Sequence, residues 1–324
     1  MIAPVHERGG ALLTVLLLVA VMATIAATAL DRLRVGTRLA ANVATVDQSR
    51  AWLGMAEELA LTRIEDLVGA DDSRTLGQGW LGIERTIALP GGGAATARIT
   101  DGGNCFNLNS LVEARPDGSH GERAIARRQL VALATTLGIA EGQATGIAAA
   151  AADYIDSDTA PLASGREDGA NGMRGMSSNQ LMADPSELRV VPGVGSREFG
   201  LLRPWLCALP TTELSPLNIN TLRPEQAPLL AMLAPGRLDV ARARAQLSSR
   251  PADGFASVLD FWNAPALAGA EPDQQAAAQV RLKTSFFMLH ARVDAGGLAV
   301  EEVALIDARR RPSRLVSRTY GSEV

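Results

Sequence analysis

The sequence predicts an α+β protein in which a long N-terminal helix and an antiparallel sheet are interrupted by a large helical domain. Three observations support this class. An apolar run after residue 9 continues into an amphipathic segment, two separated regions show strand patterns, and the region between them is rich in Ala and Leu, which favour helices. The 324 residues allow two domains, or one domain with a large insertion.

The apolar run is RGGALLTVLLLVAVMATIAATAL, residues 8–30, and Asp31, Arg32 and Arg34 close it. About 21 apolar residues in a helix span the roughly 30 Å hydrocarbon core of a membrane. The remaining chain has no second charge-free run of comparable length. One membrane contact at the N-terminus is therefore the most that the sequence supports.

Two kinds of processing compete at this run. Ala26, Ala27 and Ala29 mimic the small residues of a signal-peptidase site, which would make the run a cleaved signal peptide. Gly9 and Gly10 instead offer a cleavage site in front of the run, which would then be retained. The segment on the C-terminal side of the run favours retention.

Residues 31–68 lack proline and carry apolar residues at helical spacing, namely Val35, Leu39, Val43 and Val46, then Trp52, Met55 and Leu59. The apolar helix is therefore expected to continue as an amphipathic helix, which could be interrupted at Gly36 because glycine has a low helix propensity. A cleaved signal peptide has no reason to be continuous with the first helix of the mature domain.

Strands are predicted at 83–90 and 94–101, joined through glycines, and at 284–293, 298–308 and 314–320 near the C-terminus. The segments ERAIARRQLVALATTLG and AEGQATGIAAAAADYI between them predict helices. The predicted organisation is a leader at 1–9, a membrane helix at 10–30, its continuation at 31–70, a β region at 71–114, an inserted helical domain at 115–280 and C-terminal strands at 281–324.

The chain has two cysteines, Cys105 and Cys207, whose spacing fits no metal or redox motif. If the apolar run delivers the rest of the chain across a membrane, the oxidising compartment favours a disulfide between them. Such a long loop would contribute roughly 4–5 kcal/mol in the chain-entropy model. The alternative is two buried free thiols that act as small hydrophobic residues.

A short leader that ends in Arg-Gly, followed by an apolar helix that continues as an amphipathic one, resembles type IV pilins and type II secretion pseudopilins. The resemblance implies that a prepilin peptidase cuts between Gly9 and Gly10. Most of that family carry Glu at the fifth mature position, where this chain has Thr14, or Val15 if the cut follows Gly10. Lack of this Glu, together with the segments CFNLN, IDSD…GRED and PLNINT, resembles the K-type minor pseudopilins over essentially the whole chain.

This resemblance implies a pilin-like core, an inner-membrane protein with a single span, and a bulk that lies in the periplasm. It implies I-type and J-type minor pseudopilins as partners and a place at the tip of the pseudopilus, whose assembly the chain would initiate or cap. The residues expected to pack against other pseudopilin helices share the apolar run: Leu12, Leu13, Val15, Leu16, Leu17 and Val19.

An acidic segment lies in the middle of the predicted helical domain. Five carboxylates cluster there: Asp153, Asp156, Asp158, Glu167 and Asp168. Hard oxygen ligands on an irregular segment suit Ca²⁺, although the spacing is not that of an EF-hand. The alternative is a solvated acidic loop, and the resemblance implies calcium because K-type pseudopilins hold it in this domain.

The segment from Ser186 to Pro210 predicts two short helices around a Pro-Gly-Val-Gly turn, and PLNINTLRPEQAPLLAML resembles half of a second such unit. Helix-hairpin-helix units can bind DNA phosphates, with Arg197 and Arg203 as candidate cations. A membrane-anchored protein of a DNA uptake system is therefore the competing hypothesis. The net charge of −4 and the pI near 5.5 argue against nucleic acid, so the hairpin is expected to be structural.

No enzyme motif is present. The chain lacks G-x-S-x-G, HExxH and P-loop patterns, and His6, His120 and His290 are scattered. A basic run, Arg309 to Arg311 with Arg314 and Arg318, is expected at a solvated hairpin tip, with anionic lipid or an acidic partner as alternatives. We expect a structural protein.

Overall fold

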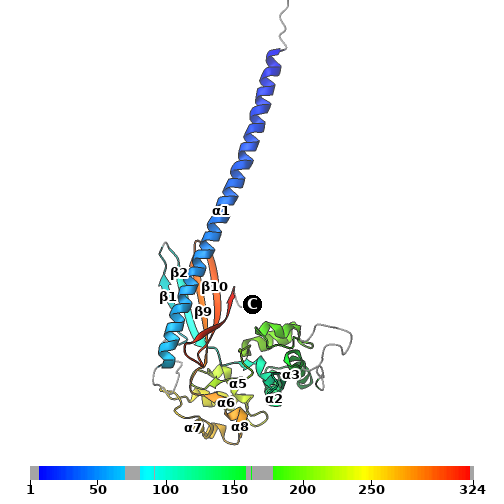
Figure 1. Ribbon diagram of the computed structural model, residues 1–324, viewed down its shortest axis with the longest axis vertical. Helices are drawn as coiled ribbons and strands as arrows, with labels where there is room; N and C mark the ends of the chain where they lie inside the picture. Colours follow the sequence, from blue (N-terminus) through cyan, green and yellow to red (C-terminus); the bar gives the residue numbers. More distant parts are fainter. Residues whose placement is uncertain (1–6, 70–80, 91, 158–161, 163–177, 322–324) are drawn as a thin grey trace, which may run out of the picture.

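The computed structural model describes residues 7–69, 81–90, 92–157, 162 and 178–321. A single helix, α1 (Glu7–Gly69), forms a shaft that projects far beyond the rest of the molecule (Figure 1). Its 63 residues pass through Gly36 without a break. The predicted continuity of the apolar and amphipathic segments is therefore confirmed.

Five antiparallel strands form one sheet in the order β1-β2-β9-β10-β11. The strands are β1 (Arg85–Ala88), β2 (Ala94–Asp101), β9 (Phe286–Ala295), β10 (Leu298–Asp307) and β11 (Arg314–Tyr320). The β9–β10 hairpin turns at Gly296 and Gly297, whose φ angles of 59° and 78° match the right-handed twist of the strands. The two predicted β regions meet where β2 pairs with β9, so the α+β fold class is confirmed.

The C-terminal part of α1 packs on one face of this sheet (Figure 1). The buried side chains of the helix recur every three or four residues: Ser49, Leu53, Glu57, Ala60 and Ile64. They meet a face of β9 that carries Leu289, Ala291 and Val293. The predicted stripe from Val35 to Val46 continues this face, because Val46 lies seven residues, or about two turns, before Leu53.

Met55 and Leu59, which the sequence pattern places in the same stripe, lie elsewhere. They are 60% and 51% exposed. Met55 is two residues past Leu53, which places it about 200° around the helix and away from the sheet. The sheet covers only one side of α1, so this second apolar pair stays in solvent.

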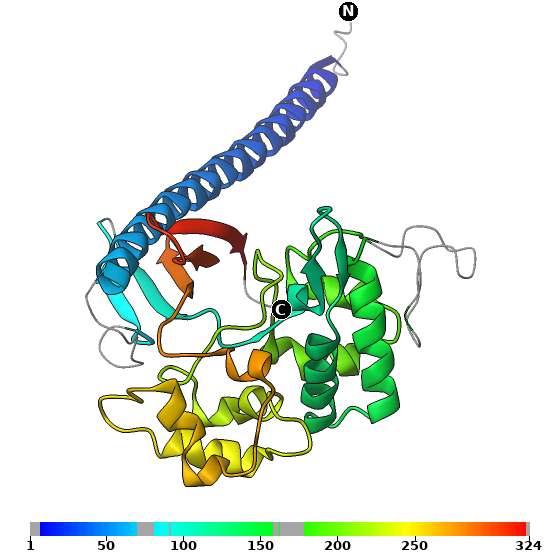
Figure 2. The same ribbon diagram turned by 60° about the horizontal axis from the view of Figure 1, so that its bottom comes forward.

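The chain between β2 and β9 forms a helical domain beyond the end of the shaft, in two adjoining lobes (Figure 2). Its α-helices are α2 (Ala124–Thr136), α3 (Glu141–Ile155), α4 (Ser196–Leu202), α5 (Ala227–Ala231), α6 (Val240–Ser248), α7 (Val258–Trp262) and α8 (Gln274–Ala277). Its 3-10 helices are η1 (Leu108–Leu111), η2 (Pro185–Val190), η3 (Arg203–Trp205), η4 (Pro224–Gln226) and η5 (Pro265–Leu267).

Short two-stranded ladders, which the sequence did not predict, tie this domain together. They pair β3 (Phe106–Asn107) with β6 (Leu206–Cys207), β4 (Val112–Ala114) with β5 (His120–Glu122), and β7 (Leu217–Asn218) with β8 (Val280–Arg281). Phe106, Leu108 and Leu111 are buried in the helical core. The domain therefore begins before the expected boundary at residue 114, because β3 and β4 pair inside it instead of extending the sheet.

An ion cluster with two buried carboxylates joins α1 to the sheet. Glu57, which is 5% exposed, accepts hydrogen bonds from Arg318 of β11, with Arg318 Nε 2.5 Å from Glu57 Oε1. Glu302 of β10 is buried and lies 4.0 Å from the same nitrogen. Burial, together with the neighbouring Glu57, raises the pKa of Glu302 to about 7, and Arg318 opposes both effects. One guanidinium thus serves two carboxylates.

Glu302→Gln is expected to make the free energy of unfolding less dependent on pH. The folded-state pKa of Glu302 is raised from 4.5 to about 7, so its contribution to stability is fully present below about pH 4.5 and is lost as the pH rises through about 7. Urea unfolding of the full chain in detergent, between about pH 5 and about pH 8, measures this slope. Glu301→Gln, on the opposite face of β10, is the control. An unchanged slope in Glu302→Gln would contradict the assignment.

Candidate assembly surface and domain junction

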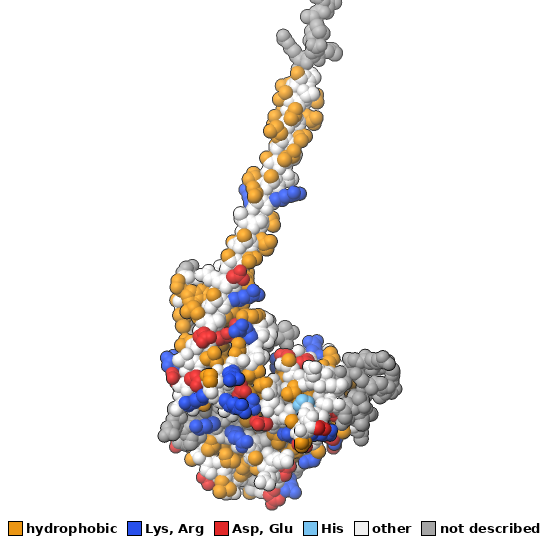
Figure 3. Space-filling view, viewed as in Figure 1, with side chains coloured by type: hydrophobic (Ala, Val, Ile, Leu, Met, Phe, Trp, Pro, Cys, Tyr) orange, Lys and Arg blue, Asp and Glu red, His pale blue; other side chains and the backbone are white. Residues whose placement is uncertain are grey.

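The first part of α1 exposes apolar side chains all around the helix. The predicted assembly residues are 57–70% exposed: Leu12, Leu13, Val15, Leu16, Leu17 and Val19. Figure 3 shows this part as a shaft of hydrophobic side chains with almost no charge. The helix is long and apolar enough to cross a membrane. So large an exposed apolar surface is suited to lipid or to other helices.

The predicted processing residues lie at the start of this helix. Gly9 and Gly10 belong to its first turns, and a Cβ added to Gly10 would meet nothing within 4 Å. Four residues further on, Thr14 Oγ1 donates a hydrogen bond to the Ala11 carbonyl oxygen at 2.9 Å. The hydroxyl is satisfied within its own helix, so Thr14 places neither a charge nor an unpaired polar group among the apolar side chains.

The apolar surface continues past the membrane-length run. Val35, Leu39 and Val43 are 52–66% exposed, on the face that further along α1 docks against the sheet. Met55 and Leu59 add exposed apolar side chains on the opposite face. The shaft can therefore contact neighbouring helices over most of its length.

Cys105 and Cys207 form the predicted disulfide, with their Cα atoms 5.8 Å apart. The bond links the point where the chain leaves the sheet to strand β6 of the helical domain. Because the two cysteines are 102 residues apart, the disulfide restricts a long loop of the unfolded chain, worth about 4–5 kcal/mol in the entropy model.

The two asparagines of the CFNLN segment, Asn107 and Asn109, form side-chain hydrogen bonds with the backbone of other segments. Asn107 Nδ2 donates to the carbonyl oxygens of Thr211 at 2.8 Å and Glu213 at 3.0 Å, and Asn107 Oδ1 accepts from the amides of Leu209 and Asn109. Asn109 Nδ2 donates to the Met182 carbonyl oxygen, and Asn109 Oδ1 accepts from the Met182 amide. The Asn107 side chain thus satisfies the Leu209 amide and the carbonyl groups of Thr211 and Glu213.

The PLNINT segment forms the junction between the sheet and the helical domain. Asp101, the last residue of β2, accepts hydrogen bonds from the Gly103 amide at 2.8 Å and from the hydroxyls of Thr221, at 2.7 Å, and Thr284. Asn104 and Asn218 complete the network, since each donates from its side-chain amide to one of these hydroxyls at 2.9 Å. Burial raises the pKa of Asp101, and the hydroxyl hydrogen bonds oppose that shift.

The acidic segment is only partly described. Asp153 and Asp156, at the C-terminal end of α3, are 0% and 2% exposed. The Leu162 amide donates to Asp153 Oδ1 at 3.2 Å. Asp158, Glu167 and Asp168 lie outside the described residues. Within the described ranges, no group of three or more His, Cys, Asp or Glu side chains could hold a metal ion, so the calcium site stays a prediction.

The hairpin at 186–210 is present, and its first helix begins with a capping box formed by Asp184 and Glu187. Where a phosphate would bind a DNA-binding hairpin, Glu198 Oε2 accepts from the Gly195 amide at 3.1 Å. A hydrogen bond from its own backbone amide is the largest of the causes that lower the pKa of Glu198. The exposed Arg197 pairs with this carboxylate at 3.7 Å, whereas Arg203 begins η3. A carboxylate therefore occupies the anion position, which favours the structural role of the hairpin.

Asn107→Ala is expected to lower the free energy of unfolding by about 3 kcal/mol, because it removes the partners of two buried amides, those of Leu209 and Asn109, and of two partly buried carbonyl groups. Urea unfolding of the full chain in detergent, followed by circular dichroism, measures the loss. Asn42→Ala, on the exposed surface of α1, is the control and should stay within about 0.5 kcal/mol of the parent. Equal stability of the two variants would show that the amide does not organise the segment.

Comparison with known proteins identifies relatives along the whole chain. Residues 104–211 and 217–283 match two family models described as "Type II secretion system (T2SS), protein K". Type II secretion system protein K of Klebsiella pneumoniae is 32% identical over 98% of this chain and 97% of its own. The protein of that name from Aeromonas hydrophila is 34% identical over 77% of this chain and 78% of its own.

A solved structure agrees. A chain in the crystal structure of the GspK-GspI-GspJ complex from the type 2 secretion system of enterotoxigenic Escherichia coli superposes with a TM-score of 0.73 and 30% identity. The match covers 86% of this chain and 97% of that one. From the shaft and sheet to the disulfide-linked helical domain, the chain belongs to the protein K family of the type II secretion system.

Proposed function

We propose that this chain is a minor pseudopilin of the type II secretion system, which assembles with I-type and J-type minor pseudopilins at the pseudopilus tip and initiates or caps its assembly. The observation that carries this proposal is the structural match to a chain solved in the GspK-GspI-GspJ complex, which covers 97% of that solved chain. The role is structural and involves no catalysis.

Assembly would use the exposed shaft. The six apolar residues between Leu12 and Val19, and the stripe that continues through Val35 to Val43, would pack against the first helices of neighbouring subunits. Outside the membrane this burial contributes roughly 25 cal/mol per Å² of apolar surface removed from water. Within the membrane, side-chain packing takes over, because lipid tails are as apolar as leucine.

Two features support a position at the tip. Thr14 supplies no carboxylate for a preceding subunit to neutralise, and its hydroxyl is already bonded within α1. The helical domain lies beyond the sheet at the end of α1 remote from the apolar run (Figure 1). A domain of this bulk above the pilin-like core would obstruct a further subunit on top.

Processing and location belong to the same proposal. Prepilin peptidase would cut between Gly9 and Gly10, which leaves the apolar helix intact as the single span of an inner-membrane protein with its bulk in the periplasm. Glycine favours the helix least of all residues except proline, so opening the first turn at these positions costs little.

Co-expression with prepilin peptidase and with I-type and J-type pseudopilins tests the assembly. A C-terminal tag on this chain should co-purify both partners from detergent-extracted membranes, and the intact mass should lack residues 1–9. Leu39→Asp/Val43→Asp should retain the processed mass and lose most of the partners, because charges replace the apolar contact. Asp47→Asn/Asp66→Asn, which changes exposed polar positions of α1, is the matched control.

Two results would contradict the proposal. Loss of residues 1–29 would make the run a signal peptide. Undiminished co-purification of both partners with Leu39→Asp/Val43→Asp would exclude the shaft as the assembly surface.

We also propose that the acidic segment binds one or more structural calcium ions. Asp153 and Asp156 carry buried carboxylates at the C-terminal end of α3, where the helix dipole disfavours negative charge. A divalent cation with oxygen ligands compensates such a site. These two residues would hold the ion, and Asp158, Glu167 and Asp168 are the further candidates from the sequence.

Calcium is expected to raise the thermal midpoint of the full chain in detergent relative to EGTA, because a ligand that binds only the folded state stabilises it by about 2.7 kcal/mol at 100 times its Kd. Asp153→Asn/Asp156→Asn should abolish the calcium-dependent shift. Asp47→Asn/Asp66→Asn should retain it. A parent protein whose midpoint is the same in calcium and in EGTA would argue for the solvated acidic loop.

A further inference from the structure

The basic run near the C-terminus lies far from the membrane segment. The Ser313 amide donates to Glu65 Oε1, which places the run beside the last turns of α1. Glu65 is 35 residues past Leu30, about 50 Å along the helix. That distance is several times the Debye length of roughly 8–10 Å at physiological salt, which excludes contact with anionic lipid.

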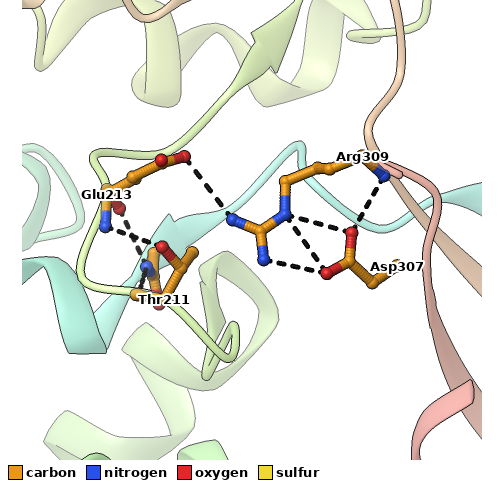
Figure 4. Close-up of polar contacts among 5 residues, drawn as sticks. Thr211, Glu213, Asp307 and Arg309 are labelled. Atoms are coloured by element: carbon orange, nitrogen blue, oxygen red, sulfur yellow. Dashed lines mark hydrogen bonds and ion pairs between the residues drawn. The ribbon is translucent and has the colours of Figure 1, made fainter. Parts of the chain in front are cut away.

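Here a groove runs between the sheet and the helical domain. It consists of two neighbouring hollows of about 350 and 440 Å³ that share Glu213 and Arg309. Figure 4 shows Arg309 extending toward Glu213 of the helical domain, with Asp307 on its other side. The Arg309 guanidinium also lies over the Phe286 ring, 4.8 Å from its centroid.

The charges that line the groove do not balance. Each of its carboxylates has an arginine partner: Glu113 pairs with Arg123 at 3.3 Å, and Arg309 serves both Asp307 and Glu213. Arg281, Arg310 and Arg314 are exposed and form no ion pair with any described residue. Figure 3 shows Lys and Arg side chains gathered where the sheet meets the helical domain. The groove is therefore locally positive in a chain whose net charge is −4.

A buried amide lines the same groove. Gln279 is 2% exposed, and neither its Nε2 nor its Oε1 has a hydrogen-bond partner among the described residues. A buried amide without partners is costly, so this side chain is suited to a ligand that offers both an acceptor and a donor. A carboxylate alone offers only acceptors, whereas a peptide group offers both.

We propose that this groove binds an extended acidic peptide segment of a partner protein. Gln279 hydrogen-bonds a peptide group of the segment, and Arg281, Arg310 and Arg314 pair with its carboxylates, for which guanidinium has the matching fork geometry. Two adjoining hollows suit an extended chain better than one small anion. The inference goes beyond the proposed assembly through α1 and does not depend on it, since the groove and α1's apolar surface are separate.

The test uses the full chain in detergent and a fluorescein-labelled acidic peptide of about eight residues that alternates Glu with Ser and Val. Fluorescence anisotropy should show binding that weakens with added salt, while the same peptide with Gln for Glu should bind at least about tenfold more weakly. Arg310→Glu/Arg314→Glu should weaken binding by at least about tenfold. Arg85→Glu/Arg244→Glu, which makes the same charge change at exposed sites elsewhere, should bind like the parent.

A second variant separates binding from folding. Gln279→Met keeps the size of the side chain and removes the unpaired amide, so it should raise the thermal midpoint by about 2–4 °C and still weaken peptide binding several-fold. A merely structural Gln279 would not give stabilisation together with loss of binding. Failure of the parent to bind the peptide, equal binding by Arg310→Glu/Arg314→Glu and its control, or displacement of the peptide by millimolar inorganic phosphate would each overturn the proposal.

Discussion

The position of the helical domain on the sheet depends on one half-buried carboxylate. Asp101 ends β2, and the donors around it come from three parts of the chain, namely the outgoing connection at Gly103, the PLNINT segment at Thr221 and the returning connection at Thr284. Hydrophobic contact is non-directional, but a carboxylate withdrawn from water requires donors in defined places. Of these donors, Thr221 comes from the body of the helical domain, so another orientation of the domain would remove that hydrogen bond from Asp101. The disulfide between Cys105 and Cys207 closes the same junction covalently.

A comparable constraint sets how α1 lies on the sheet. The three- and four-residue spacing of the stripe from Ser49 to Ile64 repeats along the helix, so the spacing alone does not specify one register. The pairing of Glu57 with Arg318 would not survive a shift of the helix by one turn, and a buried charge that loses its partner is strongly destabilising. The ion cluster therefore specifies one register of the helix. Through that register and the Asp101 junction, the shaft and the helical domain keep a defined geometry, as an assembling subunit requires.

Predictions from local pattern held where local physics is decisive. The length of the apolar run and the absence of proline from residue 31 to residue 68 indicate α1, and alternation with glycine turns indicates β9 and β10. These predictions failed where the outcome depends on which distant residue a side chain or strand contacts. Met55 has the spacing of a packed residue but faces away from the sheet, and the strands near residues 106–114 pair within the helical domain. Glu57 looks like a solvated charge in the sequence, and only its contact with Arg318, 261 residues away, explains its burial.

The sequence by itself determined the continuous shaft, the positions of the main strands and of the two longest helices of the helical domain, and the residues by which the family is recognised. These features depend on neighbouring residues, since helix and strand periodicity, turn glycines and apolar run length are local properties. The tertiary structure alone decided which face of α1 is buried, which asparagines hold the 207–213 segment, and that Arg281, Arg310 and Arg314 surround a groove with Gln279 inside. Those outcomes require contacts between residues tens to hundreds of positions apart, and burial and charge pairing are properties of such contacts, which no local pattern encodes.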